Sequence, residues 1–192
     1  MPTDKSHPLY FIAIIPSEPL ASELMQLKEY FRDHYNSKAS LNSPPHITLH
    51  MPFRWKDQRK EELWGGLTEV AHESESFTVE LQNFNAFAPR VIFVDVLKNP
   101  ALEKLQQAVS QMGRRKLKLD TGNYKGQAFH PHITLAFRDL RKPMFREAWS
   151  DFSQRSFTGN FKADHLVLLK HSGKNWEVHE RFKFGKTNVE VI

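Results

Sequence analysis

The sequence predicts an α+β fold made of two similar halves that face each other across a cleft. The pentapeptide Pro-His-Ile-Thr-Leu occurs twice, at residues 45–49 and 131–135. In a chain of 192 residues, such an identity arises by chance about once in a hundred sequences at average amino-acid usage. His132 follows His46 by 86 residues, and the other matching segments keep a similar offset. The chain is therefore interpreted as an internal duplication.

The elements of the first half follow from their residue patterns. An uninterrupted apolar run is typical of a buried strand, and apolar residues spaced three and four apart are typical of a helix. Strict alternation of apolar and polar residues predicts a half-buried strand. By these signals the chain reads strand, helix, motif strand, helix and strand over residues 9–15, 17–35, 46–53, 57–72 and 77–87.

The second half repeats this order and adds one strand. The expected elements cover residues 90–97, 100–112, 132–137, 143–152, 161–171 and 176–184. The last two strands would form a hairpin across the polar segment 172–175. No Pro/Gly/Ser-rich linker separates the halves, so we expect a single domain over residues 1–192. Its lobe-forming repeats would span about residues 9–87 and 90–184, related by a pseudo-two-fold axis, each with its own sheet.

The two motif copies would each present one imidazole and one hydroxyl on the same face of a strand. Proline is tolerated at the first residue of a strand, and the β-branched residues that follow favour this conformation. Side chains alternate between the faces of a strand, so the isoleucine and leucine of each copy would enter the core. His46 and Thr48 would then point together into the cleft, as would His132 and Thr134.

This set of side chains suits phosphate chemistry. Imidazole titrates near neutral pH, so two of them can act as base and acid in one reaction. Hydroxyl groups and imidazole N–H groups can hold the non-bridging oxygens of a phosphate. We therefore assign His46 and His132 as catalytic residues, and Thr48 and Thr134 as substrate-binding residues. The alternative is that both histidines are buried packing residues, and that the repeat records only the duplicated fold.

Composition limits the class of protein and of partner. The chain has no cysteine, which excludes disulfides and cysteine-based zinc sites and suits a reducing cytoplasm. The one apolar run near the N-terminus, residues 11–15, is too short to span a membrane. We expect a cytoplasmic monomer without membrane association. The formal net charge of +5 fits a polyanionic partner such as RNA or a nucleotide.

The paired motifs make the chain resemble the two-histidine (2H) phosphoesterases, in particular the LigT-like RNA 2′,3′-cyclic phosphodiesterases, also called 2′-5′ RNA ligases. The segments LYFIAIIPSEPL and LVLLKHSGKNWEVHERFKF resemble the first strand and the closing hairpin of that branch. The resemblance implies lobes with mostly antiparallel sheets, helices packed outside them and a central cleft. The family often has arginine directly after the second motif strand, where this chain has Phe137. Arg138 follows, and strand alternation would place it beside His132 as a substrate-binding residue.

The resemblance implies a metal-independent phosphodiesterase without a cofactor. The expected reaction is hydrolysis of the 2′,3′-cyclic phosphate of RNA or a nucleotide to a 2′-phosphate, with the reverse 2′-5′ ligation as a possible second activity. The sequence does not assign base and acid to the two histidines. It also leaves open whether the substrate is an RNA end, a tRNA half, ADP-ribose cyclic phosphate, 2′-5′ oligoadenylate or another small phosphodiester.

Two other hypotheses remain open at the level of sequence. His46 and His50 could share a metal if they lay on a helix, but a strand separates them by roughly 13 Å. His130 and His132 share a strand face without a cysteine or carboxylate beside them in the sequence. A non-catalytic RNA- or nucleotide-binding module is the second alternative, although binding alone does not require two titrating groups. The segments 37–44 and 120–130 flank the motifs and are expected to select the substrate.

Overall fold

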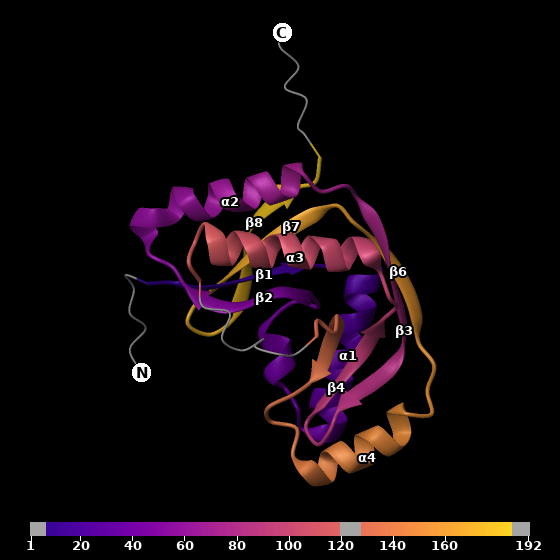
Figure 1. The fold of residues 1–192 in the computed structure, drawn as a ribbon. Helices are drawn as coiled ribbons and strands as arrows, with labels where there is room; N and C mark the ends of the chain where they lie inside the picture. The colour runs from indigo at the N-terminus through magenta and orange to yellow at the C-terminus, as the bar shows by residue number, and fades with distance from the viewer. Residues whose placement is uncertain (1–6, 120–127, 186–192) are drawn as a thin grey trace.

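The computed structural model describes residues 7–119 and 128–185, and these residues form one curled eight-stranded sheet with helices on both sides (Figure 1). The strands are β1 Leu9–Ile14, β2 Ile47–Arg54, β3 Phe77–Phe87, β4 Val91–Val96, β5 His132–Ala136, β6 Thr158–Ala163, β7 His165–His171 and β8 Trp176–Lys183. The α-helices are α1 Leu20–Tyr35, α2 Lys60–His72, α3 Pro100–Arg115 and α4 Lys142–Phe152. Two short 3₁₀ helices, η1 Ala39–Asn42 and η2 Asp57–Arg59, complete the described elements.

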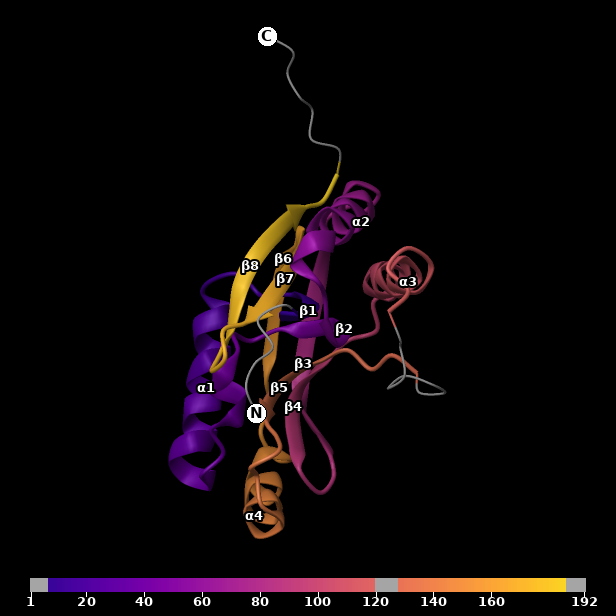
Figure 2. The same cartoon turned by 90° about the vertical axis from the view of Figure 1, so that its left-hand side faces the viewer.

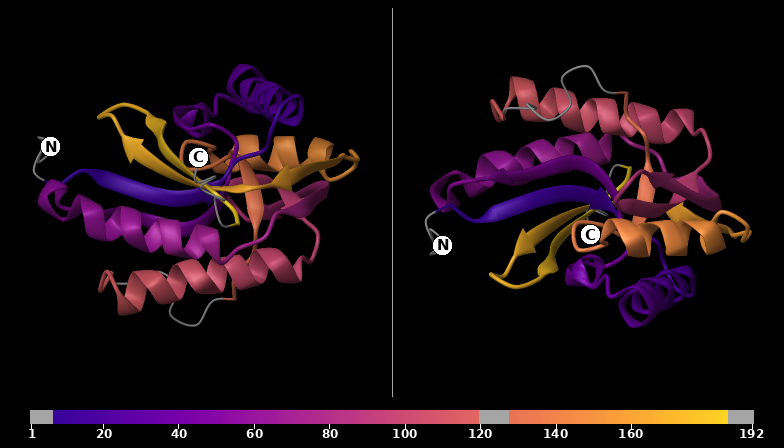
Figure 3. Two further views of the ribbon diagram at one scale, coloured as in Figure 1. Left: turned by 90° about the horizontal axis from the view of Figure 1, so that it is seen from above. Right: turned by 90° about the horizontal axis from the view of Figure 1, so that it is seen from below.

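The order of strands in the sheet is symmetric about its centre. It runs β6-β3-β4-β5-β2-β1-β7-β8, and every neighbouring pair is antiparallel. The two motif strands β2 and β5 lie in the middle and join at a single residue pair, Ile47 with Ile133. Helices α1 and α3 lie on opposite sides of the sheet (Figures 2 and 3). The α+β fold with a duplicated, antiparallel arrangement is therefore confirmed.

The halves of the sheet do not coincide with the sequence repeats. We expected each repeat to form its own sheet, but β3 from the first repeat lies between β4 and β6 of the second. Likewise β7 and β8 from the second repeat extend the half that begins with β1 and β2. The cause is local, because residues 88–90 make a tight turn between β3 and β4, and strands joined by a loop this short pair with each other.

The segment 161–171, expected as one strand, is two strands. It is divided at Asp164 into β6, which pairs with β3, and β7, which pairs with β1 and β8. Buried apolar residues lie on both sides of the division, and the half-buried pair Asp164 and His165 separates them. The curl of the sheet allows a nearly continuous stretch of chain to serve its two opposite halves (Figure 1).

One continuous core lies between the sheet and the helices, and a smaller apolar cluster lies on the other face of β1 and β7. The motif residues Ile47, Leu49, Ile133 and Leu135 are at most 1% exposed in the main core, as alternation predicts. The smaller cluster consists of Phe11, Ala13, Val167 and Leu169. In the part of the chain that the structure describes, no helix is both long enough and apolar enough to cross a membrane.

Candidate active site

The pairing of the two motif strands sets the geometry of the site. Ile47 pairs with Ile133 in an antiparallel sense. The same register continued by one residue in each direction sets His46 opposite Thr134 and Thr48 opposite His132. Each histidine therefore lies opposite the threonine of the other motif copy. The four side chains that the sequence predicted to converge do converge, because the central strand pair joins the two repeats.

Both histidines are held in the same way. Nδ1 of His46 lies 2.7 Å from the carbonyl oxygen of Pro44, and Nδ1 of His132 lies 2.7 Å from the carbonyl oxygen of His130. A carbonyl oxygen only accepts hydrogen bonds, so Nδ1 carries the hydrogen in each ring and donates it. The lone pair of the neutral ring is then on Nε2. This arrangement leaves Nε2 of both rings as the nitrogen that can exchange a proton with a substrate.

Phenylalanine rings from neighbouring strands fix the two imidazoles. The ring of Phe11 on β1 lies 4.8 Å from that of His46, measured between centroids, and the ring of Phe93 on β4 lies 4.8 Å from that of His132. Phe87, at the end of β3, contacts His132 with its ring at 5.2 Å. These contacts restrict rotation of the imidazoles, so the two rings are held in fixed orientations.

His46, Thr48, His132 and Thr134 line one cavity of about 440 Å³. This volume lies within the range of small-ligand sites. Aromatic side chains make up much of its remaining wall, and these are Phe11, Phe87, Phe129, Phe137 and Trp176. Phe129 is half-buried, and its side chain both packs on the core and lines the cavity. The sequence alone does not distinguish it from a core residue.

Arg138 reaches the cavity by a different route from the one expected. The strand β5 ends at Ala136, so alternation along the strand does not extend to position 138. Arg138 instead has a left-handed backbone with φ of 54°, a conformation that is unfavourable for residues with a side chain. Its exposed guanidinium lies 5.1 Å from the Phe137 ring and forms part of the cavity wall. A strained residue of this kind is common at functional sites.

The electrostatic surroundings of the two histidines differ. Burial, together with the nearby charge of Lys28, lowers the pKa of His46 to about 4, and its hydrogen bond to Pro44 offsets this only in part. Burial also lowers the pKa of His132. The hydrogen bond to the His130 carbonyl opposes this shift, the charge of the His130 ring adds to it, and the charge of Asp95 has a smaller raising effect. The symmetric motifs therefore sit in unlike electrostatic settings.

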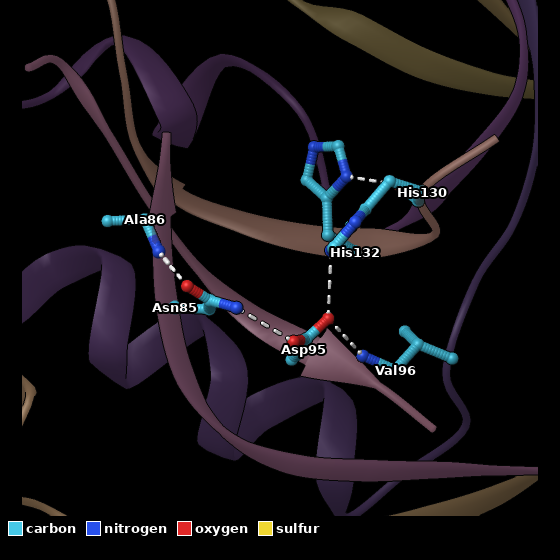
Figure 4. Close-up of polar contacts among 6 residues, drawn as sticks. All are labelled: Asn85, Ala86, Asp95, Val96, His130 and His132. Carbon is cyan, nitrogen blue, oxygen red and sulfur yellow. Dashed lines mark hydrogen bonds and ion pairs between the residues drawn. The ribbon is translucent and has the colours of Figure 1, made fainter. Parts of the chain in front are cut away.

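Asp95 and His130 form a polar network beside His132 that the sequence motifs do not reveal (Figure 4). Nε2 of His130 lies 3.0 Å from Oδ1 of Asp95. The carboxylate also accepts hydrogen bonds from Asn85 Nδ2 at 3.0 Å and from the backbone N–H of Val96 at 3.1 Å. The signal in the sequence was an aspartate inside the apolar run of β4, which pairs with β5 at His132.

The metal hypothesis based on His46 and His50 does not fit the backbone. The pairing of β1 with β2 shifts register between Ile12 and Ala13, so that Leu49 and His50 are both buried. His50 thereby leaves the face that carries His46, and its ring lies near Gly113 of α3 instead. Over residues 7–119 and 128–185, no three side chains of His, Cys, Asp or Glu gather in a way that would hold a metal ion.

The wall of the cavity nearest His46 is anchored by Asp139. Its Oδ1 accepts from the hydroxyl of Ser37 at 2.9 Å, and its Oδ2 accepts from the backbone N–H groups of Lys38 and Ala39 at 2.9 Å each. Residues 39–43 then contribute several side chains to the cavity, and the selection of the substrate by segment 37–44 stays a prediction. Of the other expected segment, residues 128–130 line the cavity, and residues 120–127 lie outside the described part of the chain.

Comparison with known proteins identifies the family. The model of the 2′-5′ RNA ligase superfamily matches residues 16–175. A protein of Geobacillus sp. (strain WCH70), named "putative phosphoesterase", is 28% identical over 185 residues, which cover 94% of this chain and 99% of the relative.

Among solved structures, TT0787 of Thermus thermophilus has a TM-score of 0.66 at 19% identity, covering 93% of this chain and 100% of the other. E. coli LigT in complex with 3′-AMP has a TM-score of 0.63 at 18% identity, with coverages of 94% and 99%.

The chain belongs to the 2′-5′ RNA ligase superfamily of two-histidine phosphoesterases. The structural neighbours share its fold over nearly the whole length of both chains. The resemblance stated from the two His-x-Thr-Leu motifs is confirmed, and with it the LigT-like fold. Membership of this superfamily supports a phosphoesterase function.

Proposed function

We propose that this protein is a metal-independent phosphodiesterase that opens the 2′,3′-cyclic phosphate of RNA or of a nucleotide. The observation that carries the proposal is the symmetric placement of two histidines, each with a free Nε2, and two threonines in one cavity. Such a set supplies a base, an acid and hydroxyl donors without any further group. The reaction yields a 2′-phosphate, and the reverse reaction with a 5′-hydroxyl in place of water would form a 2′-5′ bond.

The unlike surroundings of the histidines support one assignment of their roles. Lys28 and burial keep His46 neutral, so His46 is the base that removes a proton from water. For His132, the backbone hydrogen bond and the charge of Asp95 offset part of the lowering by burial, so we assign His132 as the acid. As the water oxygen bonds to phosphorus, the bond to O3′ breaks, and O3′ takes the proton from His132. Thr48 and Thr134 donate hydrogen bonds to the phosphoryl oxygens, where negative charge increases. Arg138 supplies a further positive charge from the cavity wall.

The cavity also suits a nucleoside. Its aromatic wall offers flat surfaces on which a base can stack irrespective of its sequence. Structures of E. coli LigT have been determined with 3′-AMP, ATP, NADP⁺ and phosphate, which shows that this fold in a relative accepts nucleotides and their phosphate groups. These observations support a nucleotide or an RNA end as the ligand of this chain.

The test is a product analysis. The pure protein is incubated in EDTA with the four nucleoside 2′,3′-cyclic monophosphates and with a short RNA ending in a cyclic phosphate, and products are separated by chromatography. We expect 2′-phosphates, and a loss of rate by about 10²–10⁴ in both His46→Ala and His132→Ala. His34→Ala, which changes an exposed histidine on α1, is the matched control. Near-normal turnover in either active-site variant would refute the paired mechanism. Tight RNA binding without turnover would favour the non-catalytic binding module.

A further inference from the structure

Lys28 is a buried cation that the mechanism above uses only through its charge. It lies on the apolar face of α1, one turn after Leu24, and is 1% exposed. Its Nζ donates to the carbonyl oxygens of Ser40 and Ser43 at 3.0 Å each. No carboxylate pairs with it among the residues that the structure describes. Burying an ammonium group without a counter-ion is costly, and here burial lowers the pKa of Lys28 to about 7.

Ser40 presents a second unsatisfied group at the same place. Its side chain is 2% exposed, and its Oγ has no hydrogen-bond partner within the described residues. A buried hydroxyl is normally paired, so a native site that keeps one unpaired calls for a specific explanation. Lys28 and Ser40 both line the cavity that holds His46. Both residues therefore border the space that a ligand would enter.

The donor count points to an anion as the missing partner. An ammonium group has three N–H donors, and two of those of Lys28 are used by carbonyl oxygens. One N–H of Lys28 and the O–H of Ser40 then remain for an acceptor in the cavity. An anionic oxygen satisfies both and also supplies the counter-charge that Lys28 lacks. A phosphate oxygen is the anionic group that the rest of the cavity is suited to receive.

We propose that Lys28 and Ser40 form an anion-binding pair that donates hydrogen bonds to a phosphate oxygen of the bound ligand. The identity of that ligand as a nucleotide or RNA rests on the proposed function, whereas the binding of a tetrahedral oxyanion does not. The pair belongs to neither His-x-Thr motif and comes from α1 and η1. Anion binding would hold Lys28 in its protonated form, because the new opposite charge favours the ammonium group.

Sulfate at pH 8 is the first probe, because it mimics phosphate without titrating in this range and cannot be turned over. Calorimetry in two buffers of different ionisation enthalpy gives both the affinity and the number of protons taken up. We expect Lys28→Met to weaken binding at least about tenfold and to lose most of the proton uptake of the parent protein. Lys38→Met, which changes an exposed lysine next to η1, should change affinity less than about twofold.

Ser40→Ala tests sulfate binding independently of folding stability. Because the Ser40 hydroxyl has no partner in the protein, its removal should leave the urea midpoint unchanged or higher. We expect sulfate affinity to fall about threefold or more in the same variant. This combination of weaker binding with intact stability cannot arise if the segment 39–43 is merely disturbed. Ser40→Ala also tests the proposal if Lys28→Met does not fold.

Equal sulfate affinity in the parent protein and Ser40→Ala, or no sulfate binding by the parent at tens of millimolar, would overturn the proposal. Kinetics then identify which phosphate is held. A higher KM of Lys28→Met for a cyclic mononucleotide places the pair at the reacting phosphate, since that substrate has only one. An effect confined to a dinucleotide substrate places it at a neighbouring phosphate. If the parent shows no turnover at all, the proposed function fails. The sulfate measurements still test whether Lys28 and Ser40 bind an anion.

Discussion

Protonation of His46 should destabilise the folded protein measurably below pH 6.5. The pKa of its ring is lowered from 6.5 to about 4, so between these pH values the unfolded chain binds a proton that the folded chain does not. Stability therefore rises with pH in this window and is lost as the pH falls. At 1.36 kcal/mol per pH unit, this one group costs about 1 kcal/mol by pH 5.5 and about 3 kcal/mol by pH 4.

Replacing the ring isolates this contribution from the other titrating groups. His46→Asn keeps a side-chain N–H that can reach the Pro44 carbonyl, but it has no proton to gain. Urea unfolding of the parent and the variant is measured from pH 8 to pH 4, and the difference in unfolding free energy is plotted against pH. The parent should lose about 3 kcal/mol relative to the variant over this range.

The ring signal of His46 in an NMR titration gives an independent measure. Its midpoint should lie near pH 4 in the parent protein, and it should move to higher pH in Lys28→Met, because the charge of Lys28 contributes to the low pKa. A free-energy difference that does not vary with pH, together with a midpoint at or above 6.5, would show that His46 is not desolvated. The assignment of His46 as the neutral base would then lose its support.

Three further changes test the surroundings of the site. Asp95→Asn removes the charge that favours protonated His132, so the alkaline limb of the kcat/KM profile should move to lower pH. Asp139→Asn replaces an oxygen that accepts from two backbone N–H groups of segment 37–39, and it should lower the unfolding free energy by about 1–3 kcal/mol in urea melts. Arg138→Ala should weaken binding of inorganic phosphate about threefold in calorimetry, since the guanidinium is at the exposed wall of the cavity.

Each of these changes has a matched control or a contrary result. Glu80→Gln removes an exposed carboxylate from β3 and should leave the pH profile where it is. If the pH profile of kcat/KM is the same for Asp95→Asn and the parent protein, Asp95 does not influence the group that acts as the acid. An unchanged urea midpoint in Asp139→Asn would mean that the segment 37–39 is not held by this carboxylate. Equal phosphate affinity after Arg138→Ala would exclude the guanidinium from the site.

The sequence predicts the local elements well because each depends on near neighbours. The expected bounds 77–87 match those of β3, and the spacing of apolar residues after Pro100 marks α3. Which strands pair is not a local property. The repeat pattern suggested two separate sheets. The tight turn after β3 instead pairs this strand with β4 and so places it in the half of the sheet that contains β5. The division of residues 161–171 at Asp164 was missed for the same reason, because the two strands differ in which neighbours they pair with.

For the site, the repeated motif was sufficient to locate both His–Thr pairs in one cavity, because a rare pattern found twice needs only the duplication to bring it together. Residues outside the motif were not found. Lys28 interrupts an apolar helix face and Asp95 interrupts an apolar strand, and either departure from the pattern was a signal of a buried charge. What the charge faces depends on tertiary packing, which local periodicity does not contain.

A duplicated fold poses a chemical problem, because it provides two equivalent histidines where the proposed hydrolysis requires one base and one acid. The backbone hydrogen bonds of the two rings are alike, so they cannot distinguish the roles. Their charged neighbours differ, with Lys28 acting on His46, and with His130 and Asp95 acting in opposite directions on His132. Different charged neighbours separate the proton affinities of the two rings, and in the proposed mechanism this separation sets the direction of proton transfer. It follows that removing both neighbours, in Lys28→Met/Asp95→Asn, should narrow the difference between the two histidine midpoints while leaving both motifs intact.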